Sequence, residues 1–395
     1  MQPVRVLILG GDGYLGWPTA MYFSQLGHEV LVVDNLAKRQ WEAEVDGAPL
    51  EPVPTLRHRV RVWNDVTGNE IGVAIGDIAE NPRFVYRVFG EFQPDATVHY
   101  AEQPSAPYSM AGREHAVYTQ RNNVVGTLNV LHAMKRYVPE SPLIKLGTMG
   151  EYGTPRIDIE EGWIDVVDAG GRSDRLPFPK MPGSFYHLSK VHDSHNIHFA
   201  CRVWGLAATD LNQGVVYGIA TDETELHPEL RTSFHYDAVF GTALNRFCAQ
   251  AVAGVPLTVY GAGGQKRGFL NIRDTLECVR LAAENPAERG EFRVFNQFTE
   301  VFSVLELAEI VRDAAATLGH DARIEHIENP RVEAEEHYYN PKNDTLLALG
   351  LQPRLLSDEL VETMLRRIAA SVDRIDRATI LPQVQWRIDS AVRQP

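Results

Sequence analysis

A strand that runs directly into a glycine-rich turn near the N-terminus constrains the fold of this chain most strongly. Residues 4–9 form an apolar run rich in β-branched side chains, which predicts a buried parallel strand. Three glycines spaced by three residues follow, and residues 18–26 predict a helix. Such glycines allow a tight turn, the close approach of a pyrophosphate to the backbone, and packing of the helix on the strand. The turn therefore predicts a dinucleotide-binding site formed by Gly10, Gly13, Tyr14, Leu15 and Gly16.

The next predicted strand ends in an acidic residue that bears on the choice of cofactor. Residues 29–33 form another apolar run, and Asp34 follows it about 20 residues beyond the glycines. A carboxylate at this place accepts hydrogen bonds from the adenosine ribose and disfavours a 2′-phosphate. The sequence therefore predicts NAD rather than NADP. The alternative is that Asp34 is only a turn residue before Asn35.

Predicted strands and helices alternate from residue 4 to residue 200. Further strands are expected over residues 73–78, 97–101 and 143–148, with a helix over 128–135. The alternation predicts an α/β fold, a Rossmann-type doubly wound parallel sheet, with ligands at the carboxyl ends of the strands. The further residues that we expect to bind the cofactor at this edge are Asn35, Asp77, Ile78, Ala101, Asn122, Gln213 and Val216.

A length of 395 residues and an apolar content of 44% allow two domains, or one domain with a substantial lobe. We expect a NAD-binding domain over residues 1–210 and a smaller mixed α/β substrate lobe over residues 211–395, with some segments returning to the Rossmann sheet. Residues 37–70 form a long connection without a clear period. Such a segment is usually functional or forms an interface.

The motif that carries the chemistry is SFYHLSK, over residues 184–190. If this stretch is helical, Tyr186 and Lys190 lie one turn apart on the same face. A phenol that exchanges protons near neutrality needs a pKa well below about 10, and a neighbouring cation favours the phenolate. With Thr148 at the end of an apolar strand, the pair is a candidate general base. The alternative is an amphipathic helix with an exposed lysine.

Charge and composition exclude several classes of partner. A net charge of −14 argues against nucleic acid, since a surface that follows phosphates should be basic. Three cysteines without C-x-x-C spacing suggest neither a zinc site nor a disulfide framework, and they fit a cytoplasmic location. No apolar run reaches the ~18 residues of a membrane span, so we expect no membrane partner.

Three histidines at spacings of three, His192, His195 and His198, raise the question of a metal site. They lie on the predicted helix after Lys190, without a matched carboxylate or cysteine elsewhere. We therefore predict solvated or interface histidines and no metal. In the second half of the chain, glycines precede Arg267, and Arg331 lies in a polar loop. A guanidinium can bind a diphosphate through two hydrogen bonds, and the alternative for each is a surface salt bridge.

Five blocks of sequence, together with the G-x-x-G-x-x-G spacing, resemble the UDP-sulfoquinovose synthase family of the extended short-chain dehydrogenases. The resemblance covers nearly the whole chain, and its blocks are residues 101–110, 146–155, 185–196, 210–218 and 331–339. It implies formation of UDP-sulfoquinovose, a sulfolipid head-group donor, from UDP-glucose and sulfite or a protein sulfur donor. It also implies a NAD that is regenerated in each turnover, and a homodimer through helices within residues 114–136 and 186–203.

The resemblance implies roles for particular residues. Tyr186, assisted by Lys190, would take the proton from the sugar O4 while C4 gives hydride to NAD, and Thr148 would align O4. Related 4,6-dehydratases carry an Asp-Glu pair after this threonine, where Met149 and Gly150 stand here. The acid and base of the elimination must then come from elsewhere, and the candidates are Glu151 and His187. The substrate-binding residues implied are Gln103, Thr148, Tyr186, Asn212, Arg267, Arg331 and Glu335.

One departure from the family pattern concerns sulfite. An arginine commonly follows Glu102-Gln103 in the family, whereas this chain has Pro104. Lys180 or Arg113 would have to replace this cation, or the sulfur donor differs. The alternative function is another NAD-retaining UDP-sugar 4-epimerase or dehydratase that makes a different C6-modified sugar. A non-enzymatic NAD-sensing protein of the same fold would be expected to lose the tyrosine or the lysine of the motif.

Overall fold

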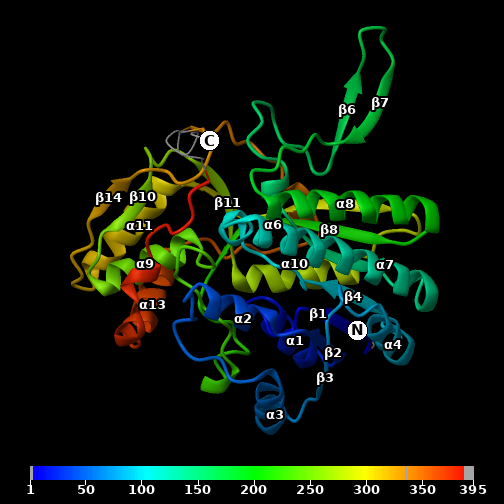
Figure 1. Cartoon of the computed structure of the whole chain (residues 1–395), viewed down its shortest axis with the longest axis horizontal. Coiled ribbons are helices and arrows are strands. Elements are labelled where there is room, and N and C mark those ends of the chain that lie inside the picture. Colours follow the sequence, from blue (N-terminus) through cyan, green and yellow to red (C-terminus); the bar gives the residue numbers. More distant parts are fainter. Residues whose placement is uncertain (1–2, 335, 387–395) are drawn as a thin grey trace, which may run out of the picture.

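A computed structural model describes residues 3–334 and 336–386, and its largest element is a seven-stranded sheet (Figure 1). The strand order is β12-β8-β5-β4-β1-β2-β3, and all neighbouring pairs are parallel. This confirms the predicted doubly wound fold class. The strands are β1 (Arg5–Leu9), β2 (Glu29–Asp34), β3 (Ile71–Ile75), β4 (Ala96–His99), β5 (Leu143–Thr148), β8 (Ala208–Gln213) and β12 (Phe292–Gln297).

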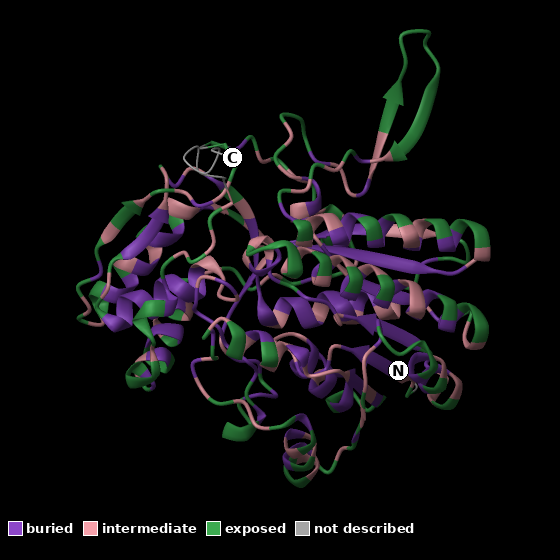
Figure 2. Cartoon of the chain, viewed as in Figure 1, coloured by how far each residue is buried: buried purple, intermediate pink, exposed green. Residues whose placement is uncertain are grey.

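Helices cover both faces of this sheet, and the alternation of side chains along β1 shows how. Val6 and Ile8 pack into the core on the side of α1 (Gly16–Gln25), α3 (Leu56–Thr67) and α10 (Ile272–Glu284). Leu7 and Leu9 point to the other side, toward α4 (Pro82–Phe92), α7 (Gly126–Tyr137) and α8 (Phe185–Trp204). Successive residues of a strand face opposite ways, so a strand buried on both faces is apolar throughout. Figure 2 shows these strands buried beneath partly exposed helices.

The second lobe lies to the left in Figure 1 and has its own core. Its three-stranded sheet has the order β13-β11-β9, and β10 pairs with β14. Helices α9, α11 and α13 pack together beside them. The bounds are β9 (Val215–Tyr217), β10 (Leu257–Tyr260), β11 (Lys266–Asn271), β13 (Glu300–Ser303), β14 (Ile324–Ile327), α9 (Ala243–Ala253), α11 (Val304–Thr317) and α13 (Asp358–Ala369). Helix α12 (Asp344–Ala348) packs instead against β12 of the large sheet.

Between β5 and α8 the chain forms a hairpin that projects from the body (Figure 1). It consists of β6 (Trp163–Val167) and β7 (Ser173–Pro177), and most of its residues are exposed. Trp163 at its base packs edge-on against His198 of α8, with ring centroids 5.2 Å apart. On the same helix, Nδ1 of His192 lies 3.0 Å from the side-chain oxygen of Gln120. Two of the three regularly spaced histidines thus have packing or hydrogen-bond partners.

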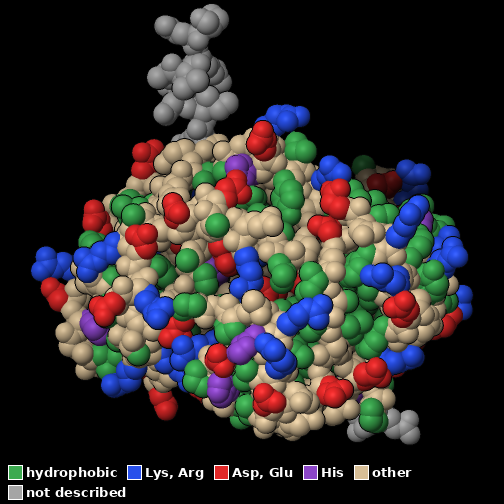
Figure 3. Space-filling view, turned by 60° about the horizontal axis from the view of Figure 1, so that its bottom comes forward, with side chains coloured by type: hydrophobic (Ala, Val, Ile, Leu, Met, Phe, Trp, Pro, Cys, Tyr) green, Lys and Arg blue, Asp and Glu red, His purple; other side chains and the backbone are tan. Residues whose placement is uncertain are grey.

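The described part of the chain offers neither a metal site nor a membrane span. Among these residues, no group of three or more His, Cys, Asp or Glu side chains could hold a metal ion. None of the described helices is long and apolar enough to cross a membrane. On the face shown in Figure 3, acidic and basic side chains are interspersed, so the excess negative charge there is spread over the surface.

The segment 37–70 is more ordered than its sequence predicts. It contains α2 (Ala37–Glu44) and α3, and α3 starts at Thr55, whose side chain accepts a hydrogen bond from the backbone of His58. The buried positions of α3 include Leu56, Arg59 and Trp63. These positions have helical spacing, but an arginine among them breaks the apolar pattern. This is why the helical period of the buried residues could not be recognised in the sequence.

Arg59 ties this segment to the glycine-rich turn and to the second lobe. Its guanidinium is fully buried and lies 2.6 Å from Oδ1 of Asp12, and 4.7 Å from the centre of the Trp17 ring. It also donates to the backbone oxygen of Arg231, at 3.4 Å. Asp12 has a second cation, Arg39, at 2.7 Å. The turn is thus held by two guanidinium groups that both come from the segment 37–70.

We expect Arg59→Leu to lower the free energy of unfolding by about 3 kcal/mol, because removing one partner leaves a buried charge without its compensation. The matched control is Arg57→Leu, which changes an exposed residue of the same helix and should stay within about 0.5 kcal/mol of the parent. Urea denaturation of the two variants measures the difference. Equal stability of both would show that the buried ion pair does not hold the turn.

Candidate active site

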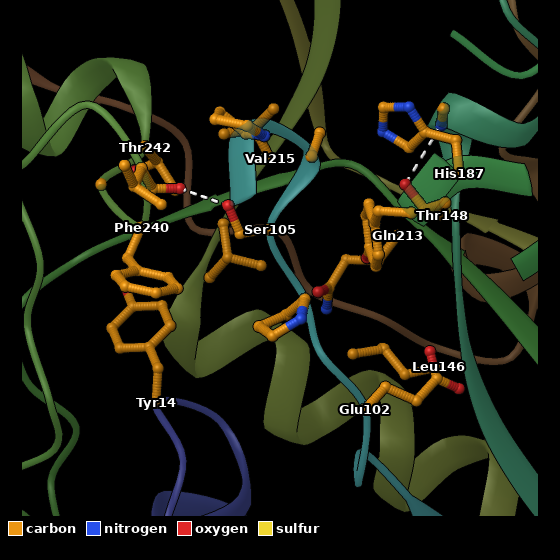
Figure 4. Close-up of a pocket in the computed structure, with 18 of the residues that line it drawn as sticks. Tyr14, Glu102, Ser105, Leu146, Thr148, His187, Gln213, Val215, Phe240 and Thr242 are labelled. Carbon is orange, nitrogen blue, oxygen red and sulfur yellow. Dashed lines mark hydrogen bonds between the residues drawn. The ribbon is translucent and has the colours of Figure 1, made fainter. Parts of the chain in front are cut away.

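A cavity of about 710 Å³ opens between the carboxyl edge of the large sheet and the second lobe (Figure 4). Most of the residues predicted from the sequence line it. They are Gly10, Gly13, Tyr14, Leu15, Gly16, Asp34, Asn35, Ile78, Ala101, Asn122, Thr148, Tyr186, His187, Gln213, Val216, Arg267 and Arg331. Others lie behind its wall, namely Asp77, Gln103, Glu151, Lys190 and Asn212. Glu335 lies outside the described residues.

The three glycines of the turn have different reasons to be glycine. Gly10 has a φ of +91°, and a Cβ there would lie 2.8 Å from the backbone nitrogen of Ala101. A Cβ on Gly16 would overlap the carbonyl oxygen of Gly10. A Cβ on Gly13 would meet only that same oxygen, at 3.5 Å. The first two are therefore required by packing within the protein, whereas Gly13 leaves open the side that faces the cavity. This cradle fits a pyrophosphate at the start of α1.

Asp34 stands at the end of β2 beside this cradle. Its carboxylate accepts hydrogen bonds from the backbone of Asp12, at 2.8 Å, and of Leu36, at 2.7 Å. Burial raises the pKa of Asp34 to about 6, so the group is still largely ionised at neutral pH. Next to it, Nδ2 of Asn35 donates to Asp77 at 2.8 Å. Asp77 thus supports the cavity wall through Asn35, although it does not line the cavity itself.

Helix α8 places the tyrosine and the lysine of the motif one turn apart, as predicted. It begins after Ser184, whose side chain accepts a hydrogen bond from the backbone of His187. The ammonium of Lys190 lies 5.6 Å from the centre of the Tyr186 ring. Burial nevertheless raises the pKa of Tyr186 more than the charge of Lys190 lowers it. The expected depression of this pKa is therefore wrong, because desolvation of the phenol outweighs the nearby cation.

Thr148 and His187 meet at the same wall of the cavity (Figure 4). Oγ1 of Thr148 accepts a hydrogen bond from the backbone of Gly150 at 3.1 Å. The imidazole of His187 lies directly against Gly150, and a Cβ on that glycine would overlap the ring. Burial, followed by the positive charges of Arg331 and Arg267, lowers the pKa of His187 to about 3. The ring is therefore neutral at physiological pH and can accept a proton.

The cations of the second lobe lie across the cavity. Arg267 forms a salt bridge with Glu333 at 2.5 Å. For this arginine the alternative given by the sequence, a salt bridge, is therefore partly correct. The guanidinium of Arg331 lies 5.3 Å from the ring centre of Trp386. Both arginines still line the cavity. Their side chains can therefore face an anionic ligand while keeping these partners.

The two cations expected to compensate for Pro104 do not line the cavity, whereas Pro104 itself does. Lys180 forms an ion pair with the buried carboxylate of Glu151. Arg113 is exposed at the start of α6 (Arg113–Gln120), which follows α5 (Ala106–Met110). Neither Lys180 nor Arg113 therefore takes the place that an arginine after Gln103 would have.

The structure shows charged residues to which the sequence assigned no role, of which Glu102 lines the cavity and Lys145 and Asp193 lie behind its wall. Glu102, Lys145 and Asp193 are almost completely buried, and Lys145 forms ion pairs with both carboxylates. Lys145 lies within the apolar strand β5, and Asp210 within β8. A charge inside a buried strand needs a partner. This was the signal available in the sequence, although it does not identify the partner.

Ser194 joins two more buried carboxyl groups. Its hydroxyl oxygen lies 3.0 Å from Oε2 of Glu151 and 2.7 Å from Oδ2 of Asp210. A hydroxyl has one proton, so both bonds form together only when one carboxyl is protonated. Burial, followed by the negative charge of Glu151, raises the pKa of Asp210 to about 6. Asp210 therefore takes up this proton as the pH falls toward 6.

Comparison with known proteins places this site in a family. The NAD dependent epimerase/dehydratase family model matches residues 6–296. A solved structure of UDP-glucose 4-epimerase with UDP-glucose, from Thermotoga maritima, has a TM-score of 0.68 at 19% identity and covers 93% of this chain and 99% of that one. At this identity the likeness shows the fold.

Two relatives are much more similar in sequence. The chloroplastic UDP-sulfoquinovose synthase of Spinacia oleracea is 55% identical over 383 residues, which are 97% of this chain and 79% of that protein. The UDP-sulfoquinovose synthase of Sulfolobus acidocaldarius is 43% identical over 393 residues, 99% of this chain and 100% of that protein. The chain therefore belongs to the NAD dependent epimerase/dehydratase family and, within it, to the UDP-sulfoquinovose synthases.

Proposed function

We propose that this chain forms UDP-sulfoquinovose from UDP-glucose and sulfite, and that NAD stays bound and is regenerated in each turnover. The observation that carries the proposal is the arrangement of Thr148, Tyr186 and His187 on one wall of the cavity, opposite Arg267 and Arg331. This arrangement gives a site for oxidation at a sugar carbon, a neutral base, and cations for a diphosphate. The identity to two synthases over nearly the full chain supports the same reaction.

The cofactor fits the cradle described above. The glycine turn would hold its pyrophosphate, and Asp34 would accept hydrogen bonds from the adenosine ribose. Tyr186, Lys190 and the remaining residues predicted for the cofactor lie at or just behind the wall that continues from this cradle. Bound there, NAD supplies the acceptor and donor of a hydride at the sugar C4.

The protein's own part in the first step is to move a proton from the sugar O4. Tyr186 would take this proton as C4 loses its hydride, and Thr148 would hold O4 by a hydrogen bond. Because burial disfavours the phenolate, the charge of Lys190 is needed close to the ring. Arg267 and Arg331 would bind the diphosphate and so fix the sugar relative to Tyr186.

The ketone at C4 acidifies the hydrogen on C5, and we assign its removal to His187. The imidazole is neutral and lines the cavity. Diphosphate bound at Arg267 and Arg331 would offset the two charges that lower its pKa, and would make it a stronger base. The proton leaves C5 and hydroxide leaves C6, which together are one water. Sulfite then adds to C6 and a proton returns to C5, before C4 regains its hydride.

The other candidate for the elimination, Glu151, does not reach the cavity. Its carboxylate is fully buried, where Lys180 and Ser194 contact it. We therefore propose that Glu151 has a structural role within the wall, where it accepts from Ser194 and pairs with Lys180. His187, which lines the cavity, is then the candidate for the base of the elimination.

We also propose a homodimer and a cytoplasmic location. Four large apolar side chains are exposed on α6 and α8, the helices of the expected interface, namely Val117, Phe185, Phe199 and Val203. A second copy of the chain would cover them. All three cysteines are free thiols and buried, as is usual for proteins of a reducing compartment.

The first test is mass spectrometry of the products formed from UDP-glucose and sulfite by the purified protein, with no cofactor added. We expect a sulfonated UDP-hexose, and its formation without added NAD shows that the cofactor copurifies. UDP-galactose alone, or a dehydrated sugar alone in the presence of sulfite, would contradict the proposal.

Two variants separate oxidation at C4 from elimination. In His187→Asn, UDP-glucose should still reduce the bound nicotinamide, while the sulfonated product falls about 10²-fold or more because the C5 base is gone. In Tyr186→Phe, both should be lost, because O4 keeps its proton. Absorbance of the reduced nicotinamide and product analysis report the two steps. Normal product formation by His187→Asn would remove this residue from the elimination.

Two substitutions in the glycine-rich turn, at Gly13 and at Gly16, test whether the cofactor binds there. Gly13→Ala should match the melting temperature of the NAD-free parent and lose copurifying NAD, since its Cβ would meet only the Gly10 oxygen, at 3.5 Å, and would enter the space assigned to the pyrophosphate. Gly16→Ala should lose stability even before NAD is considered, since its Cβ would overlap the backbone. Calorimetry and the absorbance of released nucleotide measure both effects. If Gly13→Ala retained its NAD, the pyrophosphate would not lie at this turn.

A further inference from the structure

Four charged side chains lie together behind the ring of Tyr186, out of contact with water. They are Glu102, Lys145, Lys190 and Asp193, and none of their side chains is more than 3% exposed. Glu102 comes from the loop after β4, Lys145 from β5, and the other two from α8. Two ammonium groups and two carboxylates balance one another. The cluster is thus neutral as a whole, which is the condition for burying it.

Glu102 is the member that touches both lysines. Its Oε2 lies 2.5 Å from Nζ of Lys190, and its Oε1 pairs with Lys145. Asp193, in contrast, pairs with Lys145 alone, at 3.2 Å. Lys190 also donates to the backbone oxygen of Leu146 at 2.5 Å. Figure 4 shows Glu102 and Leu146 close together, below Thr148 and His187 in this view.

Two fixed acceptors decide where the ammonium of Lys190 can be. The ammonium donates one hydrogen bond to the backbone oxygen of Leu146, and the carboxylate of Glu102 holds it by an ion pair. The four-carbon stem of a lysine is otherwise flexible, so these bonds select one orientation. Held in this way, the ammonium lies 5.6 Å from the centre of the Tyr186 ring.

Lys190 is surrounded by other charged or titratable groups. They are Glu102, Lys145, Asp193, Tyr186, His187 and His99, and the two histidines are held neutral by burial. Asp193 acts on Lys190 only at longer range, because its direct partner is Lys145. Of the two carboxylates, Glu102 is therefore the one in direct contact with Lys190.

We propose that Glu102 is a positioning residue of the active site, which holds the ammonium of Lys190 in place beside Tyr186. The inference rests on the proposed role of Tyr186 and Lys190 in moving the O4 proton. Glu102 acts through the lysine and does not itself exchange a proton with the sugar. The competing explanation is that Glu102 only compensates the charge of Lys145.

The test compares Glu102→Gln with Asp193→Asn. Each removes one carboxylate from Lys145, but only Glu102→Gln removes the direct partner of Lys190. For Glu102→Gln we expect kcat to fall about 10²-fold, with KM for UDP-glucose within about threefold of the parent. Because the carboxylate that contacts Lys190 would be gone, the alkaline limb of the pH profile of kcat should move lower. Asp193→Asn should show a clearly smaller shift of this limb.

A second variant addresses the explanation that Glu102→Gln loses activity only because the protein is less stable. The double variant Glu102→Gln with Lys145→Met removes one charge of each sign, so its melting temperature should recover toward that of the parent. The proposal expects kcat to stay low and the pH profile to stay shifted, because Lys190 still lacks its acceptor. Recovery of both kcat and the pH profile would overturn it and leave Glu102 as the charge partner of Lys145.

The failure of this inference and that of the proposed function can be told apart. An inactive Tyr186→Phe together with an unimpaired Glu102→Gln would remove only the role of Glu102. An active Tyr186→Phe would remove the general base itself and with it the function of the lysine. Reduction of the bound nicotinamide in a single turnover reports the relevant proton transfer in all of these variants.

Discussion

All seven strands of the large sheet run in the same direction, and the rest of the structure depends on this constraint. Parallel neighbours require a crossover between strands, so helices must cover both faces. It also brings every carboxyl end to one edge. Gly10, Asp34, Ala101, Thr148 and Gln213 are far apart in the sequence, but each ends or directly follows a strand of this sheet, or begins the turn beyond it. These residues therefore meet at one edge of the sheet, and the cavity lies there.

The wall of the cavity is unusual in how much charge it buries. Asp12 lies between two guanidinium groups, Glu151 against Lys180, and Lys145 between two carboxylates. Buried pairs of this kind contribute little net stability compared with well-packed apolar side chains, although loss of one partner is costly. Their value here is in fixing orientation. They hold the glycine turn and the catalytic lysine from behind, where no ligand competes for their hydrogen bonds.

The sequence was sufficient for features that depend on local spacing. The glycine turn, the order of strand and helix, and the position of Tyr186 one turn before Lys190 follow from residues near one another in the chain. What it could not give depends on tertiary contacts. Nothing local indicates that Arg59 belongs to the turn at Asp12, and α3 was overlooked because that arginine interrupts its apolar stripe. The pKa of Tyr186 was misjudged in sign, because burial is a property of the fold.

The same distinction applies to the elimination. The absence of an acidic pair after Thr148 was evident in the sequence, and it led to His187 and Glu151 as candidates. Only the structure distinguishes them, since it places the imidazole of His187 in the space that a side chain at Gly150 would fill, and buries Glu151 completely. Glycine at this position thus makes room for the imidazole of His187, which another element supplies.

The cavity is lined both by Gly10, at the start of the chain, and by Trp386, at the end of its described part. Trp386 lies on the guanidinium of Arg331 and its backbone donates to Pro330, so the last described residues are fastened to the second lobe. A ligand that fills this cavity would therefore contact both lobes. Its release would then break contacts with both lobes, and not with one alone. For an enzyme whose cofactor must return the hydride to the same molecule that gave it up, slow release keeps the two halves of the reaction together.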